Sequence, residues 1–166
     1  MRMVSSKVPT LSRALAVFGL MTALGAGSAI AAGPFADFGG VWHGAGRASD
    51  VHGKTEALTC KSSNSPSSDG IALSLSLVCA SDSYRVDFHS DLFTDGQALR
   101  GTWTETTRSA SGEISGEIGR DVINATTTAP GFSASVYIRV VSGRRLDVVL
   151  NAQGTSINHV QVSMRR

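Results

Sequence analysis

The stretch VDFHSDLFTDGQALRGTW, from Val86 to Trp103, decides the fold of this 166-residue chain. Apolar and polar side chains alternate on both sides of Asp95-Gly96, and an Asp-Gly pair is a common two-residue hairpin turn. This turn predicts cross-strand pairs that match in chemistry, namely Leu92 with Leu99, Phe88 with Trp103, and Asp91 with Arg100. The sequence therefore predicts an antiparallel hairpin with one apolar face and one polar face.

The chain after Trp103 continues the same alternation. Loops at 109–112, 119–122 and 142–144, with a type II turn at Pro130-Gly131, keep one apolar face through successive hairpins. The predicted inward pairs are apolar: Trp103 with Ile118, Ile118 with Ile123, Ala125 with Val136, Ile123 with Ile138, Val140 with Leu146, Ile138 with Val148, and Val136 with Leu150. One apolar face over successive hairpins predicts a single sheet in chain order.

The segment before Val86 contains the two cysteines of the chain. An Asp69-Gly70 turn sets Cys60 opposite Cys79, next to an apolar face made of Ile71, Leu73, Leu75, Leu77 and Cys79. The same register sets polar residues against that face, namely Ser62, Asn64 and Pro66. We therefore expect a bulge or a longer loop at 62–68, with the disulfide between the two cysteines kept.

A first strand at about Gly40–Ala48 and a last strand at about Ile157–Arg165 complete the pattern. We expect an all-β fold, a single antiparallel up-and-down meander of about ten strands. Such a sheet exposes two edges unless its last strand pairs with its first, so we expect closure into a small barrel. The expected inward residues of the two end strands are Trp42, Gly44, Gly46 and Ala48, and Val160, Val162 and Met164; further inward glycines are Gly101 and Gly116.

The N-terminus has the features of an export signal. Three basic residues (Arg2, Lys7 and Arg13) precede or flank an apolar run, and Ala29-Ile30-Ala31 resembles a cleavage site. We predict a signal peptide at 1–32 and a single domain at 33–166, located in the periplasm or secreted, with no transmembrane segment after cleavage. The mature domain then has 12 basic and 13 acidic residues, a net charge of −1, and no basic patch for nucleic acid. An oxidising compartment favours the Cys60–Cys79 disulfide.

Gly40-Val41-Trp42 opens the predicted first strand, and a G-x-W at this place in a meander barrel resembles the calycin group of lipocalins, fatty-acid-binding proteins and avidins. In lipocalins the Trp packs at the closed end and an Arg near the last strand lies across it. The resemblance implies these roles for Trp42 and Arg165, with Arg166 as the other candidate.

The chain also departs from these families. Ser81-Asp82-Ser83-Tyr84 resembles a second lipocalin motif only loosely. The aromatic cage of avidins is not recognisable in the sequence. From Gly40 onward, through CASDSY at 79–84, GTWTET at 101–106 and PGFSA at 130–134, the chain looks like small exported proteins of alphaproteobacteria. That resemblance implies no particular activity.

Aromatic residues and one acid are the candidate ligand contacts. We expect Trp42, Tyr84, Phe88, Trp103 and Phe132 to line the interior. Glu105 falls on the inward face, opposite Val86, where a carboxylate must be paired, protonated or near water. It is either a polar anchor for a ligand or an acid at the barrel rim bonded to Tyr84 or an Arg, and we favour the rim.

Motifs for catalysis, metals and cofactors do not occur in the sequence. There is no G-x-S-x-G elbow, no phosphate-binding glycine loop before a helix, and no second inward carboxylate beside Glu105. The four histidines are scattered and are expected to be solvated: His43, His52, His89 and His159. We expect neither an enzyme nor a cofactor or metal site.

Two functional hypotheses remain. The first is a barrel that binds a small apolar or amphipathic molecule inside. The second is a disulfide-bearing envelope interaction protein or hydrolase inhibitor, with a packed core and active loops at Lys61–Gly70 or Thr107–Glu113. The first hypothesis predicts a hollow interior, and the second predicts a packed one.

Overall fold

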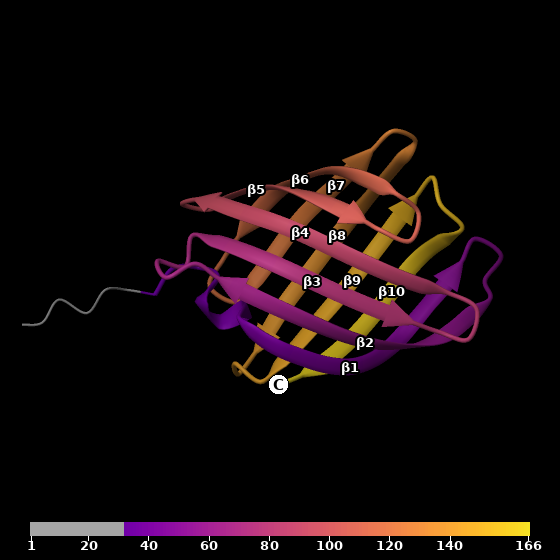
Figure 1. The fold of residues 1–166 in the computed structure, drawn as a ribbon, viewed down its shortest axis with the longest axis horizontal. Helices are drawn as coiled ribbons and strands as arrows, with labels where there is room; N and C mark the ends of the chain where they lie inside the picture. The colour runs from indigo at the N-terminus through magenta and orange to yellow at the C-terminus, as the bar shows by residue number, and fades with distance from the viewer. Residues whose placement is uncertain (1–31) are drawn as a thin grey trace, which may run out of the picture. The chain divides into compact units, whose positions relative to one another are not determined.

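The computed structural model describes residues 32–166, which form a closed barrel of ten antiparallel strands in chain order (Figure 1). The predicted signal peptide lies almost wholly outside the described residues. The fold class and the closure are confirmed, with β1 paired to β10. The elements are η1 (Ala36–Phe38), β1 (Gly40–Asp50), β2 (Thr55–Pro66), β3 (Ala72–Ala80), β4 (Arg85–Asp95), β5 (Ala98–Glu105), β6 (Ala110–Ile118), β7 (Val122–Ala129), β8 (Phe132–Val141), β9 (Arg145–Gln153) and β10 (Ile157–Arg165).

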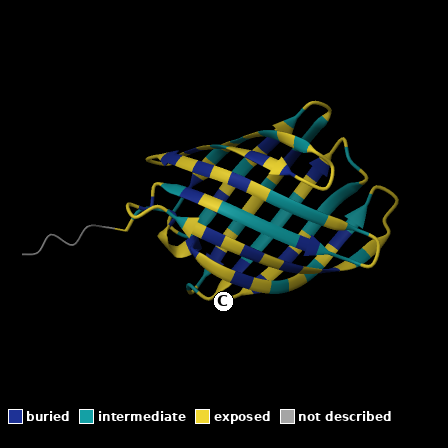
Figure 2. Cartoon of the chain, viewed as in Figure 1, coloured by how far each residue is buried: buried dark blue, intermediate teal, exposed yellow. Residues whose placement is uncertain are grey.

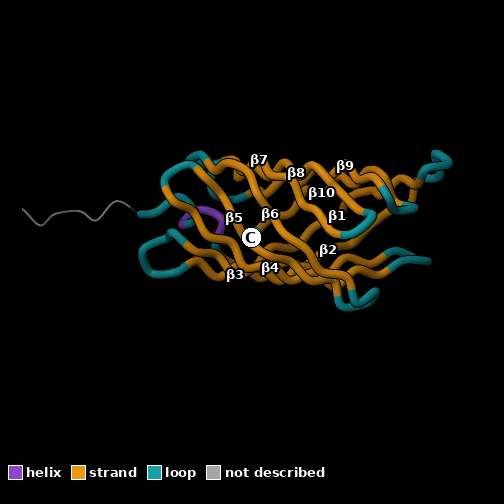
Figure 3. Tube along the Cα trace, turned by 90° about the horizontal axis from the view of Figure 1, so that it is seen from above, coloured by secondary structure: helices purple, strands orange, loops and turns teal. Residues whose placement is uncertain are grey.

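The strands alternate between buried and exposed residues, as Figure 2 shows. Successive side chains of a strand point to opposite faces, so a period-2 sequence buries one set inside the barrel. The short helix η1 lies at one end, which we call the closed end (Figure 3). Because the strands form a meander, the turns at 81–84, 106–109 and 130–131 all lie at the opposite end, which we call the mouth.

The predicted registers in the C-terminal half are confirmed. Ile118 pairs with Ile123, Ala125 with Val136, and Val140 with Leu146. At the seam, Gly44 pairs with Met164, and a Cβ at Gly44 would lie 2.0 Å from the carbonyl oxygen of Ser163. This glycine therefore permits a close approach of β1 and β10 that a side chain would prevent.

The predicted register of the β4–β5 hairpin is wrong by two residues. The turn is Gly96-Gln97 instead of Asp95-Gly96, and Thr94, not Leu92, pairs with Leu99. Gly96 has a φ of +67°, and glycine at the first central position suits a hairpin turn. Because the shift is an even number of residues, every side chain keeps its predicted face.

The predicted register of the β5–β6 hairpin is also wrong. The loop is 106–109 instead of 109–112, and Trp103 pairs with Gly112 instead of Ile118. In this register a large inward residue faces a glycine twice, since Leu99 also pairs with Gly116. A Cβ at Gly112 would lie 2.8 Å from Nε1 of Trp103, so the glycine makes room for the indole.

The disulfide Cys60–Cys79 is confirmed, with the two cysteines paired across β2 and β3. The expected bulge at 62–68 is wrong, because the ladder runs without a break to Pro66 opposite Leu73. Polar Ser62 and Asn64 are therefore buried facing the interior. Their hydrogen bonds explain this: Ser62 Oγ donates to Asn64 Oδ1, and Asn64 Nδ2 donates to the carbonyl oxygen of Phe38 at 3.0 Å.

Candidate ligand cavity

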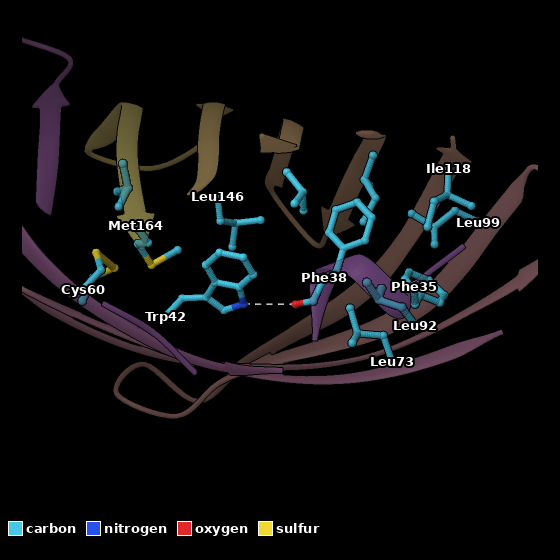
Figure 4. Close-up of a cluster of buried hydrophobic side chains, with 14 of the residues drawn as sticks. Phe35, Phe38, Trp42, Cys60, Leu73, Leu92, Leu99, Ile118, Leu146 and Met164 are labelled. Carbon is cyan, nitrogen blue, oxygen red and sulfur yellow. Dashed lines mark hydrogen bonds between the residues drawn. A yellow bond between two sulfur atoms is a disulfide. The ribbon is translucent and has the colours of Figure 1, made fainter. Parts of the chain in front are cut away.

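The closed end is sealed by a cluster around Trp42, which has no exposed surface. Its Nε1 donates to the carbonyl oxygen of Phe38 at 3.1 Å, and Phe35 and Phe38 pack edge to face beside it (Figure 4). The guanidinium group of Arg166 lies 4.8 Å from the centre of the Trp42 ring.

Arg166, and not the first candidate Arg165, is thus the arginine across the tryptophan. It also donates to the carbonyl oxygens of Gly39 and Gly143, which ties the C-terminus to the start of β1 and to the β8–β9 turn. Arg165 alternates with buried Met164 and points to solvent. The sequence did not distinguish the two arginines, because the last residue lies beyond the strand and its direction is set by the carbonyls it meets.

Above this seal lies a cavity of about 400 Å³. Inward residues near the closed end are buried, such as Leu73, Leu99 and Leu146, whereas those midway along the strands keep accessible surface toward the cavity. These half-buried residues are mostly aliphatic: Leu75, Leu77, Val136, Ile138, Val148 and Leu150. The interior is therefore hollow and apolar, with a volume typical of small-molecule sites.

Three aromatic rings line the part of the cavity nearer the mouth. Phe88 and Trp103 stack with their ring centres 5.7 Å apart, and Phe132 meets Trp103 edge to face at 5.6 Å. Phe88 pairs with Glu105 instead of Trp103, so the stacked rings are diagonal neighbours across β4 and β5. The three rings form an apolar aromatic cluster with residues from β4, β5 and β8.

Glu105 sits at the mouth, where its carboxylate is held by several donors. The backbone N–H groups of Asp87 and Thr107 and the hydroxyl of Thr107 donate to Oε1, and Arg108 is 3.3 Å from Oε2. The guanidinium of Arg108 also lies 4.1 Å from the centre of the Tyr84 ring. These contacts match the second of the two expected roles of Glu105, an acid at the barrel rim that is bonded to an arginine.

The environment of the mouth shifts two pKa values. Burial alone would raise the pKa of Glu105, but the hydrogen bonds from Thr107, Asp87 and Arg108 outweigh it and hold the pKa below its usual value. Burial raises the pKa of Tyr84, partly offset by the charge of Arg108. Glu105 is therefore ionised and paired, and Tyr84 is a neutral phenol.

Replacing Glu105 with glutamine is expected to lower the free energy of unfolding by about 1–2 kcal/mol at neutral pH, because charge-assisted hydrogen bonds are lost. Because the pKa of Glu105 is lower in the folded state than its ordinary value of 4.5, the ionised carboxylate stabilises the fold above pH 4.5. This contribution is lost as the pH falls from 4.5 through the lowered pKa of the folded state. Urea unfolding at neutral and acidic pH should thus show a difference between Glu105→Gln and wild type that shrinks in acid. The exposed Glu113→Gln is the matched control, and a difference that grows in acid would contradict the assignment.

The predicted site residues fall into two groups. Tyr84, Phe88, Trp103, Glu105 and Phe132 line the cavity, and their contact with a ligand stays a prediction. Trp42 does not line it, because Phe38 and the seal of the closed end separate it from the hollow. The sequence register placed Ser62 and Asn64 against the apolar face, but we expected a bulge to remove them from it. Sequence reasoning missed Ser90 and Thr127, although alternation along the strands marks them as inward.

Other expectations concern the rest of the described chain. His43 and His52 are exposed, and His89 pairs with Asp87 on the outer face. The proposed active loop at Lys61–Gly70 is mostly strand, since β2 extends to Pro66. The proposed loop at Thr107–Glu113 ends at Ser109, because β6 begins at Ala110. Within residues 32–166, no helix is long and apolar enough to cross a membrane.

Comparisons with known proteins support the fold. A scan against protein-family models and a search among curated proteins found no match. A search of solved structures found the S-type phycobiliprotein lyase CPES from Guillardia theta, with a TM-score of 0.55 and 12% sequence identity, over 80% of this chain and 90% of that chain. This likeness concerns the fold alone, and together with the closed ten-stranded meander it fits the calycin-like barrel that the sequence led us to expect.

Proposed function

We propose that this protein binds a small, mostly apolar molecule inside its barrel. The observation that carries the proposal is the cavity of about 400 Å³, in which aliphatic side chains from at least three strands keep accessible surface. A protein that acts only through its loops has no need of a hollow core, and interior voids cost stability. The fold likeness to a calycin-like barrel supports the same proposal.

The proposal is a binding protein rather than an enzyme. Glu105 is the acid that lines the cavity, and it is already neutralised by Arg108 and three other donors, so no free general base faces the hollow within the described chain. We further propose that the protein is exported, with the mature chain beginning near Ala32 or Gly33. The Cys60–Cys79 disulfide supports an oxidising compartment.

Native mass spectrometry tests the proposal directly. The protein is purified from an exporting host and its mass is compared before and after denaturation. We expect additional mass that is lost on denaturation, which identifies a retained small molecule, and a denatured mass that fits the cleaved, oxidised chain. A native mass equal to the denatured mass, together with no uptake of added apolar fluorescent probes, would overturn the binding function.

A further inference from the structure

A second, smaller pocket lies at the mouth of the barrel, and we call it the mouth pocket. It has a volume of about 220 Å³. Three residues line both this pocket and the ligand cavity, namely Ala48 of β1, Ile157 of β10 and Tyr84 at the end of the loop 81–84. The two hollows therefore adjoin at these side chains, and a molecule in the cavity has its mouth end beside the pocket.

The walls of the mouth pocket are polar, unlike those of the cavity. Asp50 follows buried Ala48 by two residues on β1, and Glu56 of β2 pairs with Ala48, so both acids lie on the inward side of the barrel. This corrects the expectation that no second inward carboxylate accompanies Glu105. The remaining polar residues of the pocket, besides Tyr84, are Lys54, Ser81, Ser83 and Ser156.

Glu56 already has donors on both carboxylate oxygens. Lys54 Nζ lies 2.7 Å from its Oε1, Ser81 Oγ donates to Oε2 at 2.7 Å, and Ser83 Oγ donates to both oxygens. Hydrogen bonds from Lys54, Ser83 and Ser81 lower the pKa of Glu56 to about 2, so the group is ionised at neutral pH. Glu56 and Lys54 thus form an ion pair, and Glu56 also ties the loop 81–84 to β2.

Asp50 carries the remaining charge of the mouth pocket. Its Oδ1 accepts the backbone N–H groups of His52 and Lys54, both at 2.9 Å, which fixes the turn between β1 and β2. Within residues 32–166, the hydrogen bonds to Asp50 all use Oδ1, so Oδ2 stays free to accept a donor from a ligand. Asp50 is half-buried and lines the pocket, so a molecule there can reach its carboxylate.

We propose that the mouth pocket receives the ammonium group of an amphipathic amine whose apolar part lies in the cavity. This inference rests on the proposed function. A primary ammonium group carries three N–H donors and a positive charge, so it can form a charge-assisted hydrogen bond with Asp50 Oδ2. The hydroxyl oxygens of Ser81 and Ser156 line the same pocket and can accept the other hydrogens, because a serine that donates one hydrogen bond still has lone pairs.

Charge favours an amine over a carboxylate at this place. Two acids and one base line the mouth pocket, which gives 1 − 2 = −1. Of the described cations that line the pocket or the cavity, Lys54 pairs with Glu56, and Arg108 is held by Glu105 and the Tyr84 ring. A ligand carboxylate would therefore meet Asp50 without a free cation to offset the repulsion. A neutral alcohol would gain a hydrogen bond but no charge attraction.

Three probes of equal chain length test the head group, namely decylammonium, decan-1-ol and decanoate. We expect wild type to bind decylammonium at least about tenfold more tightly than decanoate, and about threefold or more tightly than decan-1-ol, by titration calorimetry at low salt. The advantage over decanoate should shrink at high ionic strength, because the mouth is accessible to solvent and salt screens the attraction.

Variants then assign the carboxylate. Asp50→Asn removes the charge and keeps Oδ1 for the turn, so it should weaken decylammonium by about fivefold to thirtyfold and leave decan-1-ol within about twofold. Asp95→Asn makes the same charge change in the exposed β4–β5 turn at the closed end, and it should leave both affinities unchanged. If Asp50→Asn loses decan-1-ol binding, Asp50→Ser repeats the test with another side-chain acceptor for the turn.

The outcomes separate the two proposals. Binding of decan-1-ol or decanoate as tight as that of decylammonium, or an ammonium preference that the Asp50 variants do not reduce, would overturn the amine site while the proposed function stands. Failure of wild type to bind any of the three probes would count against both.

Discussion

Trp42→Ala is expected to lower the free energy of unfolding by about 3–5 kcal/mol, the usual cost of removing a large buried aromatic side chain. Trp42 is fully buried, its Nε1 donates to the Phe38 carbonyl, and its ring supports the guanidinium of Arg166. The substitution therefore opens a cavity in the seal of the closed end and releases the C-terminus. Urea unfolding followed by circular dichroism measures the change, because linear extrapolation to zero urea gives the free energy of unfolding in water.

Two variants separate the causes. Val41→Ala, at the neighbouring position that is about half exposed, should change stability by less than about 0.5 kcal/mol. Trp42→Phe keeps most of the packing and loses the hydrogen bond, so it should cost less than Trp42→Ala. A loss below about 1 kcal/mol for Trp42→Ala would show that the closed end does not depend on this side chain.

Val148→Trp is expected to weaken binding of an apolar fluorescent probe by about tenfold to a hundredfold or more, because the new ring occupies the hollow that the ligand requires. Val148 lies midway along β9, pairs with Ile138 and Val162, and lines the cavity. The same ring fills empty space, so the variant should remain folded. Titration calorimetry gives the affinity, and thermal unfolding reports the fold.

The adjacent Val149→Trp is the matched control. Val149 lies on the opposite face of β9 and does not line the cavity, so its substitution should leave the affinity unchanged. If Val148→Trp binds the probe as well as wild type does, the probe sits elsewhere on the protein. Equal losses in both variants would indicate a general effect on the sheet instead of occupation of the cavity.

Which face each residue occupies was predictable along most strands. The side-chain period of a strand is two, so an apolar alternation specifies the inward set even where the register is wrong. This is why Phe88, Trp103 and Glu105 were placed inside although two hairpin registers in that region were incorrect. The C-terminal hairpins were predicted in register as well, because Pro130-Gly131 fixes its turn and the loop at 142–144 aligns apolar pairs on both sides.

The remaining features depend on contacts between residues far apart in the chain. Asn64 is buried because it meets the Phe38 carbonyl, and Arg166 covers Trp42 because it meets the carbonyls of Gly39 and Gly143. Gly112 faces Trp103 in the observed register, where a Cβ would lie 2.8 Å from the indole Nε1.

The sequence by itself determined the strands, the inward face and the opposed cysteine pair, since these follow from a period of two and from the chain order. Closure was an expectation based on the two edges that an open sheet would expose, and the structure decided it. Tertiary structure alone decided that the barrel is hollow and that Nε1 of Trp103 and Oγ1 of Thr127 are buried in its wall without a hydrogen-bond partner. The physical reason is that the width of a closed barrel depends on strand number, tilt and stagger together, so the same inward side chains can fill it or leave a cavity.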